Sequence, residues 1–184
     1  MEEFNEESTI ELEFDKNGNI IGGIIPDVSI NYVERFLVNS FPESETRKKI
    51  FSNFKSFLSI DFIKANSNSI SGILLDGSFC TNKTNPNDID FLILLDASNA
   101  EAINSSVAFL EDPMLGSLNH IGKSFDCDVY CAIDGRTLSK GLIGTAFHQQ
   151  ADTMYKYWLG QFGFDRNSNH KGLIEVKFDG GELI

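Results

Sequence analysis

The segment 73–96 constrains the fold more than any other part of the sequence. It holds two short apolar runs, 73–75 and 91–95, which are rich in branched side chains and are bounded by residues that form turns. Runs of this length and composition are typical of buried β-strands. The sequence therefore predicts two buried strands joined by a polar loop.

Two aspartates stand at the start of the second run. Side chains at i and i+2 of a strand point to the same face, so Asp88 and Asp90 would lie side by side while Ile89 points into the core. Like charges this close repel, and burial raises the cost. A divalent cation would relieve both penalties, and a site made only of oxygen ligands suits Mg²⁺ or Mn²⁺. The alternative is a polar turn with two solvated aspartates.

Gly77 and Ser78 directly follow the first run. Glycine lets a backbone approach a ligand closely, and a helix that begins after it would aim free N–H groups at an anion. A phosphate site at one end of the loop and a metal site at the other predict binding of a nucleoside triphosphate.

This arrangement resembles the signature of the nucleotidyltransferase-fold superfamily, which contains DNA polymerase beta. The resemblance implies an α/β (α+β) domain in which helices flank a small mixed β-sheet. It also implies that Gly77 and Ser78 hold the triphosphate and that Asp88 and Asp90 bind the metal ions. Small nucleotidyltransferases usually carry a small and a basic residue soon after the serine. Here Phe79, Cys80 and Thr81 follow, and Lys83 is the only cation of the loop that could reach the nucleotide.

The superfamily places a third carboxylate on a neighbouring strand, where it completes the metal site and accepts a proton from the attacking hydroxyl. Residues 124–133 read as such a strand, with Asp126 and Asp128 on one face. We expect Asp128 to take this role because it lies deeper in the apolar run, with Asp126 as the second choice. Either could instead be an edge-strand charge that opposes aggregation.

The segment 162–176 resembles the closing segment of an uncharacterised bacterial group of small nucleotidyltransferase-like proteins. In that group an aspartate-arginine pair precedes a turn and a strand that begins lysine-glycine. Arg166 and Lys171 would clamp a triphosphate through charge-assisted hydrogen bonds. The alternative is a charged turn in which Arg166 forms a salt bridge with Asp165.

The remaining pattern predicts one domain over residues 23–184, preceded by an acidic segment 1–22. That segment contains a possible hairpin of 9–14 with 20–25, turning at 17–18. Ser44 is a good N-cap for a long helix over 45–65, whose residues Arg47, Lys48 and Lys49 would form a solvated basic face or contact phosphate or an acidic partner. No internal repeat is evident. Further helices are expected over 31–39, 101–109 and 145–158.

Composition limits the partners. The formal net charge of -12 argues against a surface that binds nucleic acid, and a basic or neutral protein partner fits better. The three cysteines lack zinc-like spacing and are expected to be reduced and buried. Because no signal peptide or membrane-length apolar run is evident, we expect a cytoplasmic protein without membrane contact.

These observations predict a metal-dependent nucleotidyltransferase that moves a nucleoside monophosphate from a nucleoside triphosphate, with ATP the expected donor, to a hydroxyl acceptor. The acceptor stays open. The small acidic domain resembles antitoxins that act beside HEPN-type toxins, so a toxin-antitoxin or defence setting with a partner protein as acceptor is one expectation. The alternative is a catalytically degenerate protein of the same fold that acts by binding a partner protein.

Overall fold

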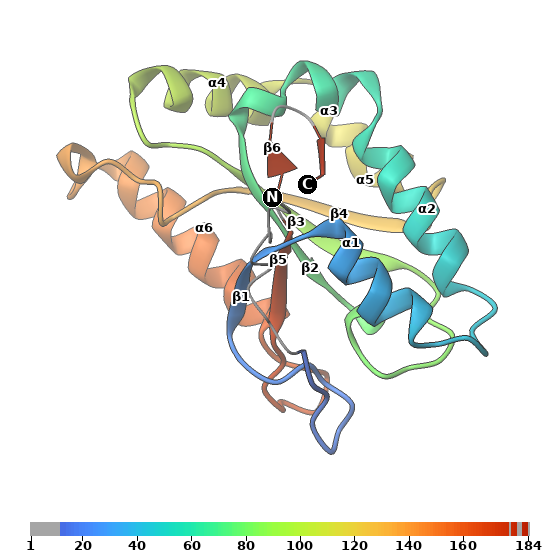
Figure 1. Cartoon of the computed structure of the whole chain (residues 1–184). Helices are drawn as coiled ribbons and strands as arrows, with labels where there is room; N and C mark the ends of the chain where they lie inside the picture. The colour runs from blue at the N-terminus through green and yellow to red at the C-terminus, as the bar shows by residue number, and fades with distance from the viewer. Residues whose placement is uncertain (1–11, 177, 180–181, 184) are drawn as a thin grey trace, which may run out of the picture.

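A computed structural model describes residues 12–176, 178–179 and 182–183. Its centre is a five-stranded mixed sheet with strand order β1-β5-β2-β3-β4 (Figure 1). The pairs β1–β5 and β3–β4 are parallel, whereas β2 is antiparallel to both of its neighbours. The expected α/β domain with a small mixed sheet is confirmed. The strands of the sheet are β1 Ile24–Val28, β2 Ile70–Asp76, β3 Ile89–Leu95, β4 Cys127–Ile133 and β5 Leu173–Val176.

Helices cover both faces of this sheet, with α6 on one face and the other helices on the opposite one (Figure 1). The two strands predicted from 73–75 and 91–95 are the central strands β2 and β3, and each contributes to a core on either side. The helices are α1 Ile30–Glu34 with a π-helical turn Arg35–Asn39, α2 Arg47–Leu58, α3 Asp61–Ala65, α4 Ala100–Glu111, α5 Leu115–Lys123 and α6 Ala146–Phe162. Single 3-10 turns span Ser67–Ser69, Ser78–Cys80 and Lys140–Leu142, and a separate ribbon pairs β6 Phe178–Asp179 with β7 Glu182–Leu183.

The long helix predicted over 45–65 is wrong in its extent. Ser44 does accept hydrogen bonds from the backbone N–H groups of Thr46 and Arg47, but the helix begins at Arg47. It ends at Leu58, and Ile60 adopts an extended conformation before α3 begins. The break turns Ile63 into the core, where it is fully buried. Apolar spacing alone cannot show such a break, because both halves keep the same stripe.

The helix α5 was not predicted, because Gly116 and Gly122 lower the expected helicity of this segment. A Cβ atom at Gly122 would lie 2.7 Å from Val129 Cγ2 and 2.9 Å from the carbonyl oxygen of Cys127. Glycine therefore lets α5 pack closely against β4, and this tertiary contact outweighs the low helix propensity.

The expectation that the sequence has no internal repeat is wrong. Residues 14–19 read Phe-Asp-Lys-Asn-Gly-Asn, and residues 164–169 read Phe-Asp-Arg-Asn-Ser-Asn. The first precedes β1 and the second precedes β5, its parallel neighbour. We call residues 15–19 the first loop and residues 165–169 the second loop.

The two loops have the same backbone structure. In each, the aspartate carboxylate accepts the N–H groups of the residues two and four positions later, at 2.8 and 2.9 Å. The fourth loop residue has a positive φ in both, 82° at Gly18 and 63° at Ser168. An antiparallel bridge closes each loop, from Phe14 to Ile20 and from Phe164 to His170. The first bridge is the described part of the hairpin expected in segment 1–22, and residues 9–11 of that hairpin lie outside the described residues.

Candidate functional site

Three aspartates form a row at one end of three neighbouring strands of the sheet. Because β2 is antiparallel to β3, its end lies where β3 and β4 begin. Asp76 pairs in register with Asp90, and Asp90 pairs in register with Asp128. We call these three residues the carboxylate row. They share the face of the sheet that α6 covers, since Leu74 and Leu92 pack in the core on that side.

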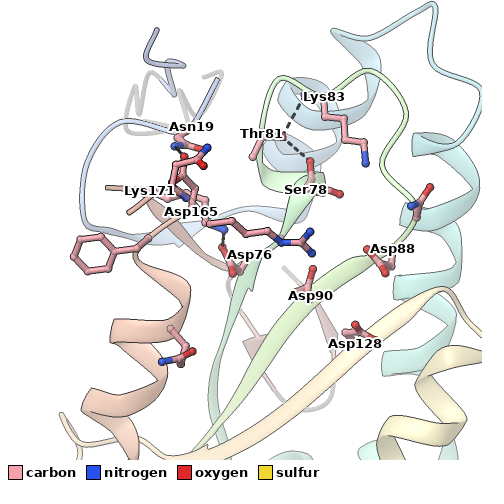
Figure 2. A pocket seen from close by; sticks show the side chains of 16 residues that line it. Asn19, Asp76, Ser78, Thr81, Lys83, Asp88, Asp90, Asp128, Asp165 and Lys171 are labelled. Atoms are coloured by element: carbon pink, nitrogen blue, oxygen red, sulfur yellow. Dashed lines mark hydrogen bonds and ion pairs between the residues drawn. The ribbon is translucent and has the colours of Figure 1, made fainter. Parts of the chain in front are cut away.

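The carboxylate row forms the floor of a pocket of about 590 Å³. Figure 2 shows Ser78, Thr81 and Lys83 on one side of this pocket and Asn19, Asp165 and Lys171 on the other. The structure therefore brings together every residue that the sequence assigned to the nucleotide or the metal, and Asp126 is outside this set. The pocket is lined by Asn19, Asp76, Gly77, Ser78, Thr81, Lys83, Asn87, Asp88, Asp90, Asp128, Gln161, Phe164, Asp165, Arg166, Asn167 and Lys171.

Asp126 does not share a face with Asp128, contrary to the sequence prediction. The strand β4 begins only at Cys127, and Asp126 precedes it with a φ of 55°. Its carboxylate turns instead toward α2, where Lys49 Nζ lies at 2.7 Å and Asn53 Nδ2 at 2.9 Å. Of the two candidates for the third carboxylate, Asp128 alone lies in the pocket.

The floor of the pocket concentrates negative charge. Ile89 is fully buried in the core on the opposite face, as the i, i+2 argument predicts for the residue between Asp88 and Asp90. Burial, followed in order by the nearby carboxylates of Asp88, Asp76 and Asp128, raises the pKa of Asp90 to about 6. A cation or a proton at this position would relieve the repulsion.

Sequence reasoning missed Asp76 as a pocket residue. It ends the first apolar run and directly precedes Gly77, so a charged residue at this border was the available signal. Asp76 is buried, and Lys171 Nζ lies 2.5 Å from its Oδ1 atom. Burial raises the pKa of Asp76, while the Lys171 ammonium opposes this increase. Lys171 is thus already paired with an acid rather than free to hold an anion alone.

The loop after β2 packs closely against Asp90 of the neighbouring strand β3. Gly77 has a φ of 76°, and a Cβ atom there would lie 1.8 Å from Asp90 Oδ2, so only glycine fits this position. The helix expected after it is a single 3-10 turn, Ser78–Cys80. Thr81 stabilises this turn by donating its hydroxyl to the Ser78 carbonyl at 2.8 Å. Lys83 is exposed and lines the pocket.

Arg47 anchors the same loop, and its expected place on a solvated basic face is wrong. The side chain is fully buried. Its guanidinium donates to the carbonyl oxygens of Leu37, Phe79, Thr81 and Lys83 at 2.6–2.8 Å. Burial lowers the pKa of Arg47 to about 10. Lys48 and Lys49 do remain exposed.

The opposite wall carries an unpaired arginine. The carboxylate of Asp165 accepts hydrogen bonds from Asn19, Asn167 and Asn169 and forms no ion pair with Arg166. The side-chain amides of Asn169 and Asn19 hold the pKa of Asp165 well below its usual range. Arg166 is exposed, lines the pocket, and makes no side-chain hydrogen bond or ion pair with any other described residue.

The floor has the donor chemistry of a magnesium site without a ready-made set of ligands. Within the described ranges, no group of three or more histidine, cysteine, aspartate or glutamate side chains is arranged to hold a metal ion. Mg²⁺ commonly keeps several of its waters and uses one or two carboxylates together with substrate phosphates. Asp88 and Asp90, which face one pocket beside the loop 77–83, fit that mode of binding. Asp128 forms an ion pair with Lys123 from the end of α5.

Two further expectations concern the rest of the chain. All three cysteines are free thiols; Cys80 and Cys127 are buried and Cys131 is half-buried. Burial raises the pKa of Cys127 and of Cys131 to about 12, so neither is a reactive thiolate near neutral pH. No helix in the described part of the chain is long and apolar enough to cross a membrane.

The fold and the site define an α/β protein with an acidic pocket at one sheet edge and basic side chains on both of its walls. The chain belongs to DUF6932, a family of unknown function, whose match covers residues 12–177. No curated protein and no solved structure matches the chain.

Proposed function

We propose that this protein is a cytoplasmic, metal-dependent nucleotidyltransferase that transfers a nucleoside monophosphate from a nucleoside triphosphate, with ATP the expected donor, to a hydroxyl acceptor. The observation that carries the proposal is that the carboxylate row and Asp88 line the same pocket as Gly77 and Ser78. Acidic groups at the floor suit divalent cations, and the basic side chains of the walls suit the phosphates of a nucleotide.

The proposed reaction displaces pyrophosphate. The acceptor oxygen forms a bond to the α-phosphorus, the bond from that phosphorus to the bridging oxygen breaks, and pyrophosphate leaves. Bound Mg²⁺ would supply charge neutralisation for the phosphates and would lower the pKa of the acceptor hydroxyl. Asp88 and Asp90 would hold the metal, and Asp128 would accept the acceptor's proton from the neighbouring strand.

The walls of the pocket would position the triphosphate. Ser78 and the backbone at Gly77 lie on the side fixed by Arg47, and Lys83 can pair with a phosphate from the same side. Arg166 and Lys171 reach the pocket from the opposite side. Positioning and charge stabilisation are most of what phosphoryl transfer requires of a protein.

The test is isothermal titration of ATP, GTP, CTP and UTP, each with Mg²⁺ or Mn²⁺, into the wild-type protein and an Asp88→Asn, Asp90→Asn double variant. We expect metal-dependent binding of at least one triphosphate by the wild type and none by the double variant. The expected loss is at least about a hundredfold in affinity, because each carboxylate is a charged metal ligand.

Asp126→Asn is the matched control, because it removes a neighbouring carboxylate that lies outside the pocket. This control should bind like the wild type, while Asp128→Asn should bind the nucleotide but lose turnover. Wild-type affinity in the double variant would exclude the proposed metal site.

A second candidate function is nucleotide or partner binding without catalysis. The observation in its favour is that Lys123 pairs with Asp128 and Lys171 pairs with Asp76, so lysines already neutralise two of the acids. In this case the protein would act by docking on a partner protein, such as the toxin of a toxin-antitoxin pair. A stoichiometric partner that the Asp88→Asn, Asp90→Asn variant neutralises as well as the wild type would favour this function.

A further inference from the structure

The two repeated loops differ in one side chain that crosses between them. In the first loop, the Asn17 amide donates to its own aspartate, Asp15, at 3.3 Å. Asn19 occupies the fifth position, where Asn169 of the second loop bonds to its own Asp165 at 2.9 Å. Asn19 instead donates its amide across to Asp165 Oδ2 at 3.0 Å. One side-chain amide of the first loop therefore donates a hydrogen bond to the aspartate of the second loop.

This crossing contact joins the two walls of the pocket. The backbone of the first loop is bound to the loop 77–83, because Gly18 accepts the Asn82 N–H at 2.9 Å and Asn19 forms a bridge with Thr81. The next residue, Ile20, accepts the Gly172 N–H at 2.7 Å. Figure 2 shows Asn19 beside Asp165 and Lys171, opposite Thr81 and Lys83.

Asn19 is buried in this position. Its exposed fraction is 3%, which is low for a polar residue in a loop. The Asp165 carboxylate accepts four hydrogen bonds from described residues, two from backbone N–H groups and two from side-chain amides. Charge-assisted bonds of this kind are stronger than neutral ones and fix geometry. Asp165 is thereby kept from pairing with the arginine that follows it.

We propose that Asn19 is a positioning residue that holds the second loop so that the unpaired Arg166 guanidinium faces the polyphosphate of a bound nucleotide. Asn19 does not itself touch the reacting atoms in this proposal. It acts through Asp165, whose carboxylate sets the backbone of the loop from which Arg166 projects. Lys16 occupies the same position in the first loop but does not line the pocket.

The proposal rests on the proposed function for the identity of the ligand, a nucleoside triphosphate. Its test therefore has two arms. The first arm is amide hydrogen exchange of the ligand-free protein, read at Asn167 and Asn169, whose N–H groups bond to Asp165. Asn19→Ala should speed exchange at both amides by about tenfold, since one bond to a charged acceptor is lost.

The matched control is Asn17→Ala, which removes a side-chain amide of the same type whose bond stays within the first loop. It should leave exchange at Asn167 and Asn169 unchanged. Asp165→Asn serves as a second variant, because it keeps the size of the side chain and removes the acceptor charge. Should Asn19→Ala prove too unstable to measure, accelerated exchange in Asp165→Asn supports the proposal and unchanged exchange overturns it.

The second arm is a double-mutant cycle on the affinity for ATP and for inorganic tripolyphosphate, each with Mg²⁺. Asn19→Ala and Arg166→Ala should each weaken binding by about tenfold, and the double variant should be no weaker than Arg166→Ala alone. Lys16→Ala should have no effect. A purely structural role for Asn19 would give additive losses, and additive losses would overturn the proposal.

The two arms separate the two possible failures. If the wild type binds no triphosphate, the proposed function is wrong, and the exchange arm still decides whether Asn19 holds the second loop. If the wild type binds a triphosphate but Asn19→Ala changes neither exchange nor affinity, the positioning role is wrong and the proposed function stands.

Discussion

At the scale of single residues, the site depends on buried charges that no local pattern identifies. Arg47 and Lys48 are neighbours in the sequence, yet one is fully buried and the other is exposed. Arg47 stacks on the Phe41 ring, with its guanidinium carbon 3.9 Å from the ring centre. Backbone carbonyl dipoles stabilise its charge, because the side chain forms no ion pair with a described carboxylate.

The first residue-scale prediction is that Arg47→Met strongly destabilises the protein. The substitution keeps an apolar side chain in place but leaves four carbonyl groups without their donor, two of them in buried bonds and two in partly buried ones. We expect a loss of about 3 kcal/mol or more in the free energy of unfolding, measured by urea denaturation.

Lys48→Met on the same helix is the matched control and should change stability by less than about 0.5 kcal/mol, because Lys48 is exposed. If the two variants unfold at the same urea concentration, the carbonyl contacts of Arg47 contribute nothing, and the loop 77–83 has another anchor.

At the scale of elements, both walls of the pocket are short loops fixed by polar contacts to distant parts of the chain. The loop 77–83 depends on Arg47 from α2, and the second loop depends on Asn19 from the first. Figure 1 shows the first loop in blue and the second in orange-red side by side at the lower edge of the molecule. The loop 77–83 also places Phe79 and Cys80 in the main core.

The element-scale prediction concerns acid stability. Hydrogen bonds from the side-chain amides of Asn169 and Asn19 hold the pKa of Asp165 in the folded protein well below its usual range. The unfolded state therefore binds more protons at low pH, and the stabilisation is present above about pH 4 and lost as the pH falls below it. Asp165→Asn should remove this part of the acid dependence.

The measurement is the thermal midpoint of unfolding from pH 5 down to pH 2.5. The decline over this range should be smaller for Asp165→Asn than for the wild type, although the variant starts from a lower midpoint. Parallel profiles would show that the hydrogen bonds to Asp165 do not favour its ionised form.

At the scale of the whole molecule, the segment 12–22 is integrated with the domain that follows it. Leu12 and Ile20 are buried in the main core. The backbone of residues 18–20 binds both the loop 77–83 and the start of β5.

The whole-molecule prediction is that deletion of residues 1–22 destabilises the entire domain. Burial of Leu12 and Ile20 alone corresponds to about 3 kcal/mol or more, and the deletion also removes the bonds between the two pocket walls. Urea unfolding should show a lower midpoint and a single transition. A truncated protein with the wild-type midpoint would mean that this segment is independent of the fold.

Local patterns in the sequence were sufficient to select Asp88 and Asp90 as pocket residues, although they missed Asp76. Asp88 and Asp90 flank the buried Ile89 and both line the pocket, as the alternation of strand side chains predicts, and Gly77 precedes a turn because glycine tolerates a positive φ. The α/β class follows from apolar runs of strand length beside apolar stripes of helical spacing. These properties depend on residues close together in the chain, so the sequence alone determined them.

Tertiary structure decided which charged residues belong to the pocket. Asp76 belongs to the carboxylate row because β2 pairs with β3 in this register. Asp126 lies outside the row because β4 starts at the residue after it. The Arg47 side chain points inward and donates to carbonyl groups far along the chain. The repeated loops became neighbours only when β1 and β5 paired in parallel. The physical reason is that burial and register are set by long-range contacts, whereas spacing and propensity report only on near neighbours in the sequence.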